Sequence, residues 1–297
     1  MKIILVKTLF LLLGILPLWL ARVLGFWVGE LSWRFNSKGT MTARTNIQHC
    51  FPELSDQQQQ ALVRSSMQEW GKTVFEMFVV WQRSFLWLEK KIIGEQKKAV
   101  FKKALAGDQG IILLAPHLGN WELLRIMSRY RAMTGLYQPP GDKALEDIVK
   151  KARSDGGMRL VPTNRRGIVA LVKALRAGEM TSILPDQTPM ELHSGIHVPF
   201  FGLPALTMTL VHKLLKTGSI AVMVAAKRVK GGFEVVYAEP DPEIYSEDQT
   251  VSVAALNRSV ESLVRQFPEQ YQWEYKRFKK PPEGEAKIYG KTNREEK

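Results

Sequence analysis

A histidine and a glutamate five positions apart directly follow a short apolar run. They are His117 and Glu122 in the segment "ILLAPHLGNWE", residues 112–122. A histidine can take a proton from a hydroxyl near neutral pH, and a carboxylate that accepts its N–H fixes the tautomer. The pair therefore predicts general-base chemistry in which a hydroxyl of the substrate is the nucleophile. The alternative is a structural histidine at a strand end and a glutamate that only faces a helix dipole.

The elements around this pair alternate between short apolar runs and amphipathic segments. "IILLAP" (111–116) is expected to form a strand buried on both faces, and "NWELLRIMSRYRAM" (120–133) a helix after it. Further helices are expected over 55–81, 94–110, 144–154, 166–178, 206–218 and 251–268, and further strands over 180–186, 219–229 and 233–240. This alternation predicts an α/β fold with a mixed, largely parallel sheet flanked by helices.

Sites in such sheets form beyond the carboxyl ends of the strands, where loops carry polar side chains. His117 stands at one predicted strand end, and Asp186 and Gln187 follow another apolar run, "TSIL". Both positions are therefore candidates for one site. Asp186 can instead be an ordinary turn residue.

Residues 1–35 are apolar almost throughout and predict an N-terminal membrane helix. The uncharged core from Thr8 to Ala21 would span about 21 Å as a helix, short of the roughly 30 Å hydrocarbon layer unless Lys7 and Arg22 reach the headgroups. Two interpretations stay open: a tilted span, or a helix in the interface anchored by its tryptophans. Because the apolar run continues without a small-residue cleavage site, a removable signal peptide is disfavoured.

Composition excludes several classes of protein. A single cysteine, Cys50, among 297 residues rules out an intramolecular disulfide and a four-thiolate metal site. His193 and His197 have no evident third ligand, so no metal is assigned. The net charge of +13 attracts polyanions. No nucleic-acid motif is recognisable and the N-terminus is apolar, so lipid is favoured over nucleic acid.

Six motifs carry a resemblance to a known family. In chain order they are "PHLGNWE", "LYQPPGD", "ARSDGG", "LPDQTP", "PFFGLPALT" and "PEQYQWEYKRFK". In this order, behind an apolar N-terminus, they resemble the late acyltransferases of lipid A biosynthesis, from the N-terminus to about Lys279. The wider glycerolipid acyltransferase superfamily shares the first motif but more often has Asp where Glu122 stands.

The resemblance implies an enzyme of the bacterial inner membrane, with its catalytic domain on the cytoplasmic face. Such an enzyme moves a fatty acyl chain from acyl carrier protein to a hydroxyl of a Kdo-bearing lipid A precursor, and it needs no cofactor. The implied partners are the carrier protein, the glycolipid and the inner membrane. On this basis residues 1–35 are the membrane anchor, residues 36–280 the acyltransferase domain, and residues 281–297 a poorly ordered tail.

The resemblance also implies roles for particular residues, in a direct transfer through a ternary complex. His117 acts as general base, and Glu122 orients it. Arg153 is a candidate donor to the oxyanion, and its alternative is a solvated arginine at a helix end. Asp186 and Gln187 line the cleft. The "FFG" residues shape an acyl or substrate pocket by resemblance, whereas composition alone makes them core: Phe200, Phe201 and Gly202.

Two rival functions stay open at this point. One is an acyltransferase of the same build that acts on another glycolipid or on a glycerolipid. The other is a non-catalytic, membrane-anchored protein that binds acyl carrier protein or anionic lipid, in which His117 and Glu122 are structural. The presence of both residues favours the enzyme.

Overall fold

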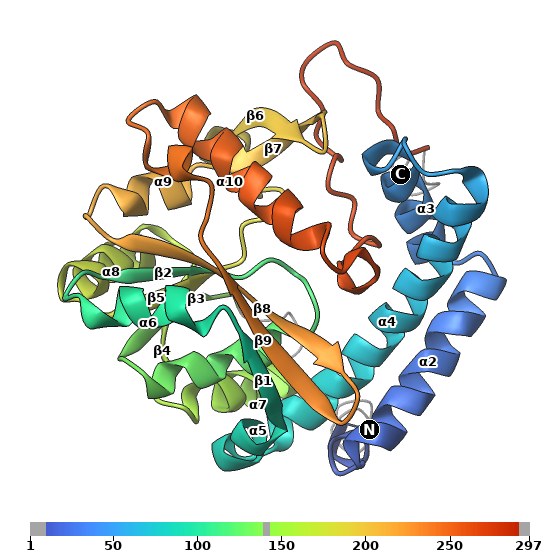
Figure 1. Cartoon of the computed structure of the whole chain (residues 1–297), viewed down its shortest axis with the longest axis horizontal. Coiled ribbons are helices and arrows are strands. Elements are labelled where there is room, and N and C mark those ends of the chain that lie inside the picture. Colours follow the sequence, from blue (N-terminus) through green and yellow to red (C-terminus); the bar gives the residue numbers. More distant parts are fainter. Residues whose placement is uncertain (1–9, 139–142, 291–297) are drawn as a thin grey trace.

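The computed structural model describes residues 10–138 and 143–290. Within them, seven strands form one sheet in the order β1-β9-β8-β2-β5-β3-β4 (Figure 1). The strands are β1 (Ile92–Gln96), β2 (Ile111–Leu114), β3 (Met133–Tyr137), β4 (Arg159–Pro162), β5 (Met180–Ile183), β8 (Ile220–Val229) and β9 (Gly232–Ala238). Only β8 and β9 pair antiparallel; the other neighbours are parallel. The predicted α/β class with a mixed, largely parallel sheet is confirmed.

Helices cover both faces of this sheet, and a separate hairpin pairs β6 (Gly195–Phe200) with β7 (Leu203–Met208). The α-helices are α2 (Leu18–Arg34), α3 (Lys38–Cys50), α4 (Asp56–Gln82), α5 (Phe85–Lys91), α6 (Lys98–Ala106), α7 (Lys143–Ser154), α8 (Arg165–Arg176), α9 (Leu210–Leu215) and α10 (Gln249–Val264). Short 3-10 helices are η1 (Trp121–Arg129), η2 (Leu192–Ser194), η3 (Pro242–Tyr245) and η4 (Pro268–Gln270). The helix predicted after Ser55 is α4, and Ser55 with Gln58 forms a capping box at its start.

Strand β2 explains why its sequence has no alternation of polar and apolar residues. Ile112 and Leu114 belong to a core cluster with α3, α4, α8 and α10, whereas Ile111 and Leu113 belong to a cluster with α5, α6 and η1. All four side chains are fully buried. A strand covered on both faces must be apolar at every position, which is the pattern that "IILL" predicts.

Some predicted elements differ from the observed ones. The helix predicted over 120–133 is the shorter 3-10 helix η1, and the last residue of the predicted range, Met133, is the first residue of β3. The helix predicted over 206–218 is only α9, because residues 206–208 lie in β7. β1, β3, β4, β6 and β7 were not predicted, since strands of four to six residues with glycine or proline give no clear period. Residues 139–142 of "LYQPPGD" lie outside the described residues.

The predicted N-terminal membrane helix is not supported. Pro17 interrupts the helix within the apolar run, because it stands as N-cap of α2 and separates α2 from the helical turn over residues 10–14. Over the described part of the chain, no helix combines the length and the apolar character needed to cross a membrane. Residues 1–9 of the predicted anchor lie outside the described residues. Within the predicted tail, Tyr289 donates a 2.6 Å hydrogen bond to Asn46, and residues 291–297 are not described.

Helices α2 and α4 lie side by side at one edge of the molecule (Figure 1). Glycines allow their backbones to touch: a Cβ on Gly29 would overlap the Met67 carbonyl, and one on Gly71 the Gly25 carbonyl. The close approach fixes α2 on α4. It therefore also fixes the face that α2 turns away from the protein.

We expect Gly29→Ala to lower the free energy of unfolding by about 1–3 kcal/mol, because the added methyl forces the two helix backbones apart. Urea denaturation measures the change. Gly39→Ala in α3 is the matched control, since the nearest atom to its Cβ would be 3.5 Å away. Equal stability of the two variants would contradict the tight α2–α4 contact.

Candidate active site

His117 and Asp186 meet at the carboxyl edge of the sheet. β2 and β5 are parallel neighbours that end together at Leu114 and Ile183, so the loops after them leave at the same place. Asp186 accepts two hydrogen bonds from His117: one from the backbone N–H to Oδ2 and one from Nδ1 to Oδ1, both 2.8 Å. The aspartate therefore holds both the ring and the backbone of the histidine.

These contacts assign the tautomer of His117. Nδ1 carries the proton that Asp186 accepts, and Nε2 accepts a hydrogen bond of 3.1 Å from the side-chain amide of Gln187. An imidazole that has its lone pair on Nε2 is the form that can act as a base. Burial alone would raise the pKa of Asp186, but the charge and hydrogen bonds of His117 lower it overall. Asp186 is thus an anion placed to stabilise an imidazolium.

The pocket beside His117 is nearly closed in this conformation. Its volume is about 10 Å³, and it is lined by Trp70, Thr73, His117, Trp121, Gln270, Tyr271, Gln272 and Glu274. The Trp121 ring meets the His117 ring edge-on at 4.7 Å between centroids. A volume of this size holds about one water molecule. In this conformation the pocket therefore has no room for a group much larger than water.

Glu122 is not the partner of His117 in this structure, which corrects the pairing expected from the sequence. Both of its carboxylate oxygens bind the guanidinium of Arg153, at 3.1 Å from Nε and in a short contact from Nη2. Burial would raise the pKa of Glu122, yet Arg153 lowers it overall. The local reach from residue 117 to 122 favoured a contact between them, but η1 directs the glutamate toward α7 instead.

The guanidinium of Arg153 is likewise engaged in contacts within the protein. Its charge is paired with Glu122, and its guanidinium also lies over the Tyr137 ring at 5.7 Å. The preceding carbonyl, of Ala152, accepts a hydrogen bond from the buried Arg125. Arg153 is therefore not a solvated helix-end residue, and in this conformation it is not a free oxyanion donor.

The structure does not bring the "FFG" residues to His117. Phe200, Phe201 and Gly202 form the turn between β6 and β7, with positive φ at Phe201 and Gly202. Phe200 and Phe201 are buried in the core, where Phe201 packs on Phe51 and Trp273. They do not line the pocket beside His117. Their packing matches the core interpretation that composition alone gave.

The segment after η4 contributes contacts that the sequence did not reveal. Gln272 donates its backbone N–H to the His117 carbonyl at 3.0 Å, and its side chain accepts from Gln187 at 3.1 Å. Tyr275 accepts the Thr188 N–H through its hydroxyl at 3.0 Å. The motif "PEQYQWEYKRFK" marked this segment in the sequence. It did not indicate that the segment forms hydrogen bonds with both the loop after β2 and the loop after β5.

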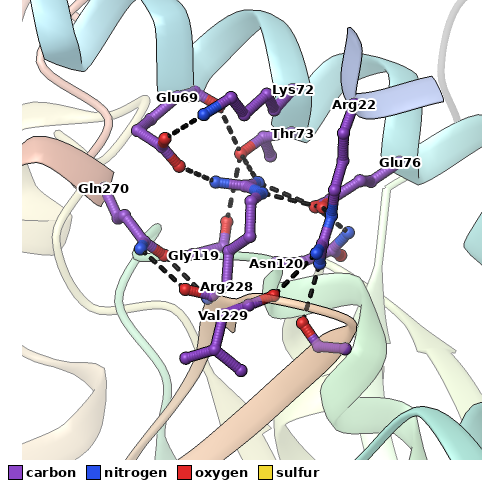
Figure 2. A network of polar contacts seen from close by, with 11 residues as sticks. Arg22, Glu69, Lys72, Thr73, Glu76, Gly119, Asn120, Arg228, Val229 and Gln270 are labelled. Carbon is purple, nitrogen blue, oxygen red and sulfur yellow. Dashed lines mark hydrogen bonds and ion pairs between the residues drawn. The ribbon is translucent and has the colours of Figure 1, made fainter. Parts of the chain in front are cut away.

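A buried charge network supports the His117 loop from the side of α4 (Figure 2). Glu76 binds Arg228 at 2.7 Å, Arg22 at 2.6 Å and the Asn120 amide at 3.2 Å. Thr73 donates to the Gly119 carbonyl at 3.4 Å and accepts from Arg228 at 2.6 Å. Residues two and three positions after His117 are therefore tied to α4 and β8.

Glu274 is an unpaired carboxyl group beside His117. Both oxygens are buried, and neither has a hydrogen-bond partner among the described residues. Burial raises its pKa to about 7. The folded protein therefore holds a proton that an unfolded glutamate loses near pH 4.5.

This difference predicts a pH dependence of stability. Between about pH 4.5 and pH 7 the folded state binds the extra proton, so the free energy of unfolding falls as the pH rises through this window. Glu274→Gln cannot ionise and should remove that part of the fall. Denaturant titrations at both ends of the window measure it. Glu283→Gln, an exposed glutamate on the same segment, should keep the wild-type dependence; an unchanged slope in Glu274→Gln would refute the assignment.

No group of three or more His, Cys, Asp or Glu side chains within residues 10–138 and 143–290 is placed to hold a metal ion. His193 pairs with the exposed Glu191 at 2.8 Å. His197 lies in β6 and contacts the Lys280 carbonyl at 2.9 Å. The two histidines thus have separate partners.

The fold and this edge of the sheet define a class: an α/β protein with a histidine–aspartate pair whose unprotonated ring nitrogen can act as a base. Comparison with known families makes the class specific. The model of the bacterial lipid A biosynthesis acyltransferases matches residues 2–280. The chain belongs to this family and is an acyltransferase of lipid A biosynthesis.

Relatives of known name match along most of their length. The lipid A biosynthesis lauroyltransferase of Escherichia coli K12 is 28% identical over 278 residues, which cover 90% of this chain and 87% of the relative. The palmitoleoyltransferase of the same organism is 25% identical over 293 residues, covering 93% and 92%. The myristoyltransferase is 23% identical over 279 residues, covering 88% and 82%. The three names differ in the acyl chain, so the likeness fixes the reaction class and not the chain length.

Proposed function

We propose that this chain is a late acyltransferase that moves a fatty acyl chain from the thioester of acyl carrier protein to a hydroxyl of a Kdo-bearing lipid A precursor. The observation that carries the proposal is the His117–Asp186 pair, in a chain of this family, with Nε2 as an acceptor. A thioester and a hydroxyl need a base, and the protein offers one at the sheet edge.

In the proposed reaction Nε2 of His117 takes the proton of the acceptor hydroxyl as its oxygen attacks the thioester carbonyl. The tetrahedral intermediate then expels the thiolate, which receives that proton from the imidazolium, so no proton is gained or lost overall. Asp186 stabilises the imidazolium. When the hydroxyl takes the place of Gln187 at Nε2, the amide N–H of Gln187 becomes available to the oxyanion.

We assign Glu122 and Arg153 a positioning role. Glu122 directly follows Trp121, whose ring contacts the His117 ring edge-on. The Glu122 side chain is almost fully buried in its pair with Arg153. A buried pair of this kind fixes the start of η1. Arg153 would act on the oxyanion only if it released Glu122.

The partners follow from charge and apolar surface. A net charge of +13 suits an acidic carrier protein and a phosphorylated glycolipid. Helix α2 exposes large apolar side chains, among them Trp19 at 67% and Trp27 at 57%. Such a face fits the interface of the bacterial inner membrane, with the catalytic domain on the cytoplasmic side. No nucleic-acid partner is proposed.

The test is acyl transfer by the full chain in detergent. The protein is incubated with lauroyl- and myristoyl-carrier protein and the tetra-acylated Kdo-bearing precursor, and the product mass is read. His117→Ala is the control. A gain of one acyl chain that is absent in folded His117→Ala supports the proposal. Transfer only to a glycerolipid or another glycolipid would overturn the proposed acceptor, and transfer by folded His117→Ala would overturn the base.

A further inference from the structure

Two adjoining cavities run along helix α2 on the side of the β8–β9 turn. The first has a volume of about 510 Å³ and lies between α2, α4 and the end of β8; the second, of about 640 Å³, lies between α2, α5 and the same turn. They share Arg22 and Lys230. We call them together the α2 trough. The cationic side chains that line it are Arg22, Lys72, Arg83, Lys91, Arg228 and Lys230.

The charge of the α2 trough is not balanced by its surroundings. The carboxylates that its cations bind are Glu69, in its lining, and Glu76, behind it. Within the described part of the chain, six cations against two carboxylates leave four positive charges without a carboxylate partner. A cavity with walls of low dielectric concentrates the field of such charges. The α2 trough therefore attracts an anion.

In the first of the two cavities, two lysines are the available donors. Arg22 is occupied by Glu76, the Val229 carbonyl and the Gly232 carbonyl, and Figure 2 shows Arg228 equally enclosed. The Lys72 ammonium forms one ion pair, with Glu69, and lies over the Phe26 ring at 5.5 Å, and the exposed Lys230 makes no hydrogen bond or ion pair to any described residue. An ammonium with unused donors binds phosphate as a point charge. The arginines supply the field, and Lys72 and Lys230 supply the contacts.

Apolar surface borders the same cavities. Val23 and Trp27 of α2 line the first cavity, and Trp19 and Trp87 line the second. Val23, Trp19 and Trp27 are also exposed on the outer surface of α2, at 45%, 67% and 57%. Tryptophans beside lysines are typical of the level at which lipid headgroups meet hydrocarbon. An anion with acyl chains fits this border better than a soluble one.

The α2 trough also adjoins the pocket of His117. Gln270 lines both the first cavity and the pocket beside His117. On α4, Lys72 faces the trough while the next residue, Thr73, faces the pocket. Gln270 further accepts the Gly119 N–H at 3.0 Å through its carbonyl. A headgroup in the trough would therefore lie next to the pocket of His117.

We infer that the α2 trough binds a phosphate group of the lipid acceptor, held by Lys72 and Lys230, while the acyl chains of that lipid lie along the exposed face of α2. The inference rests on the proposed function for the identity of the acceptor. It adds where the headgroup binds, and it accounts for a basic cavity next to an apolar helix face.

The test is the double variant Lys72→Gln/Lys230→Gln in the full chain. Each lysine near an anionic headgroup contributes about fivefold in affinity, so KM for the phosphorylated precursor should rise roughly 10- to 25-fold at low salt. The matched control, Lys213→Gln/Lys216→Gln, removes two exposed charges from the end of α9, far from α2. With enzymatically dephosphorylated precursor, the wild type and both double variants should have the same KM.

Binding separates this inference from the proposed function. Sedimentation with phosphatidylcholine vesicles that carry the phosphorylated precursor, the dephosphorylated precursor or phosphatidylglycerol requires no catalysis. Weaker binding of Lys72→Gln/Lys230→Gln to the phosphorylated precursor alone supports the site, even if no acyl transfer occurs. Transfer with an unchanged KM, equal losses in both double variants, or an equal loss toward phosphatidylglycerol would overturn it.

Discussion

Asp186→Asn is expected to lower kcat by about 10²–10⁴-fold without unfolding the protein. The asparagine amide would donate to Nδ1 of His117, where the aspartate accepts from it. The ring proton would then move to Nε2, and the base would lose its lone pair. Steady-state kinetics with acyl carrier protein and the lipid acceptor measure the loss, and circular dichroism checks the fold.

Glu122→Gln is the informative comparison. It keeps the size of the side chain and leaves the His117–Asp186 pair intact, so we expect its kcat per folded molecule to fall much less than that of Asp186→Asn. The reverse order would mean that Glu122 turns toward His117 in the working state and that the Asp186 contact is only structural. The two variants thus decide which carboxylate serves the base.

Part of this site could be predicted from the sequence, and part could not. His117, Asp186 and Gln187 could each be named as candidates, because each follows an apolar run that forms a strand. Their contact was not, because it depends on β2 and β5 being neighbours in the sheet, although 69 positions separate the two side chains. As the partner of His117, the sequence indicated only the nearer carboxylate, Glu122. Topology brought a more distant one to the ring.

The charge network around Glu76 and Arg228 could not be predicted from the sequence, for a different reason. Glu69 and Glu76 lie on the amphipathic helix α4, where charged residues normally face solvent. Arg228 interrupts an apolar strand and gives no sign of its partner. Only when α2 and β8 meet α4 do Glu76 and Arg228 become buried, with Glu69 partly buried beside them. The class of fold followed from the alternation of elements, whereas the burial of charge followed from their arrangement in space.

Glu76→Gln is expected to lower the free energy of unfolding by about 3–5 kcal/mol, because it leaves Arg22 and Arg228 without their shared carboxylate in a buried site. Burial would raise the pKa of Glu76, but Arg228 and Arg22 lower it overall, so the carboxylate is the form that stabilises the fold. Urea denaturation measures the loss. The exposed Glu53–Arg265 pair is the control, and Glu53→Gln should cost at most about 1 kcal/mol.

A double-mutant cycle shows whether the network acts as a unit. Arg228→Met alone leaves Glu76 with Arg22 and Glu69 with Lys72, whereas Glu76→Gln alone leaves two cations together. In Glu76→Gln/Arg228→Met one cation and its lost partner are both removed, so the double variant should be more stable than the sum of the single losses predicts, by roughly 0.5–3 kcal/mol. Additive losses would mean that the charges contribute independently. Coupled losses would mean that α2, α4 and β8 are fixed together by one charge cluster, which holds the His117 loop on one side and the α2 trough on the other.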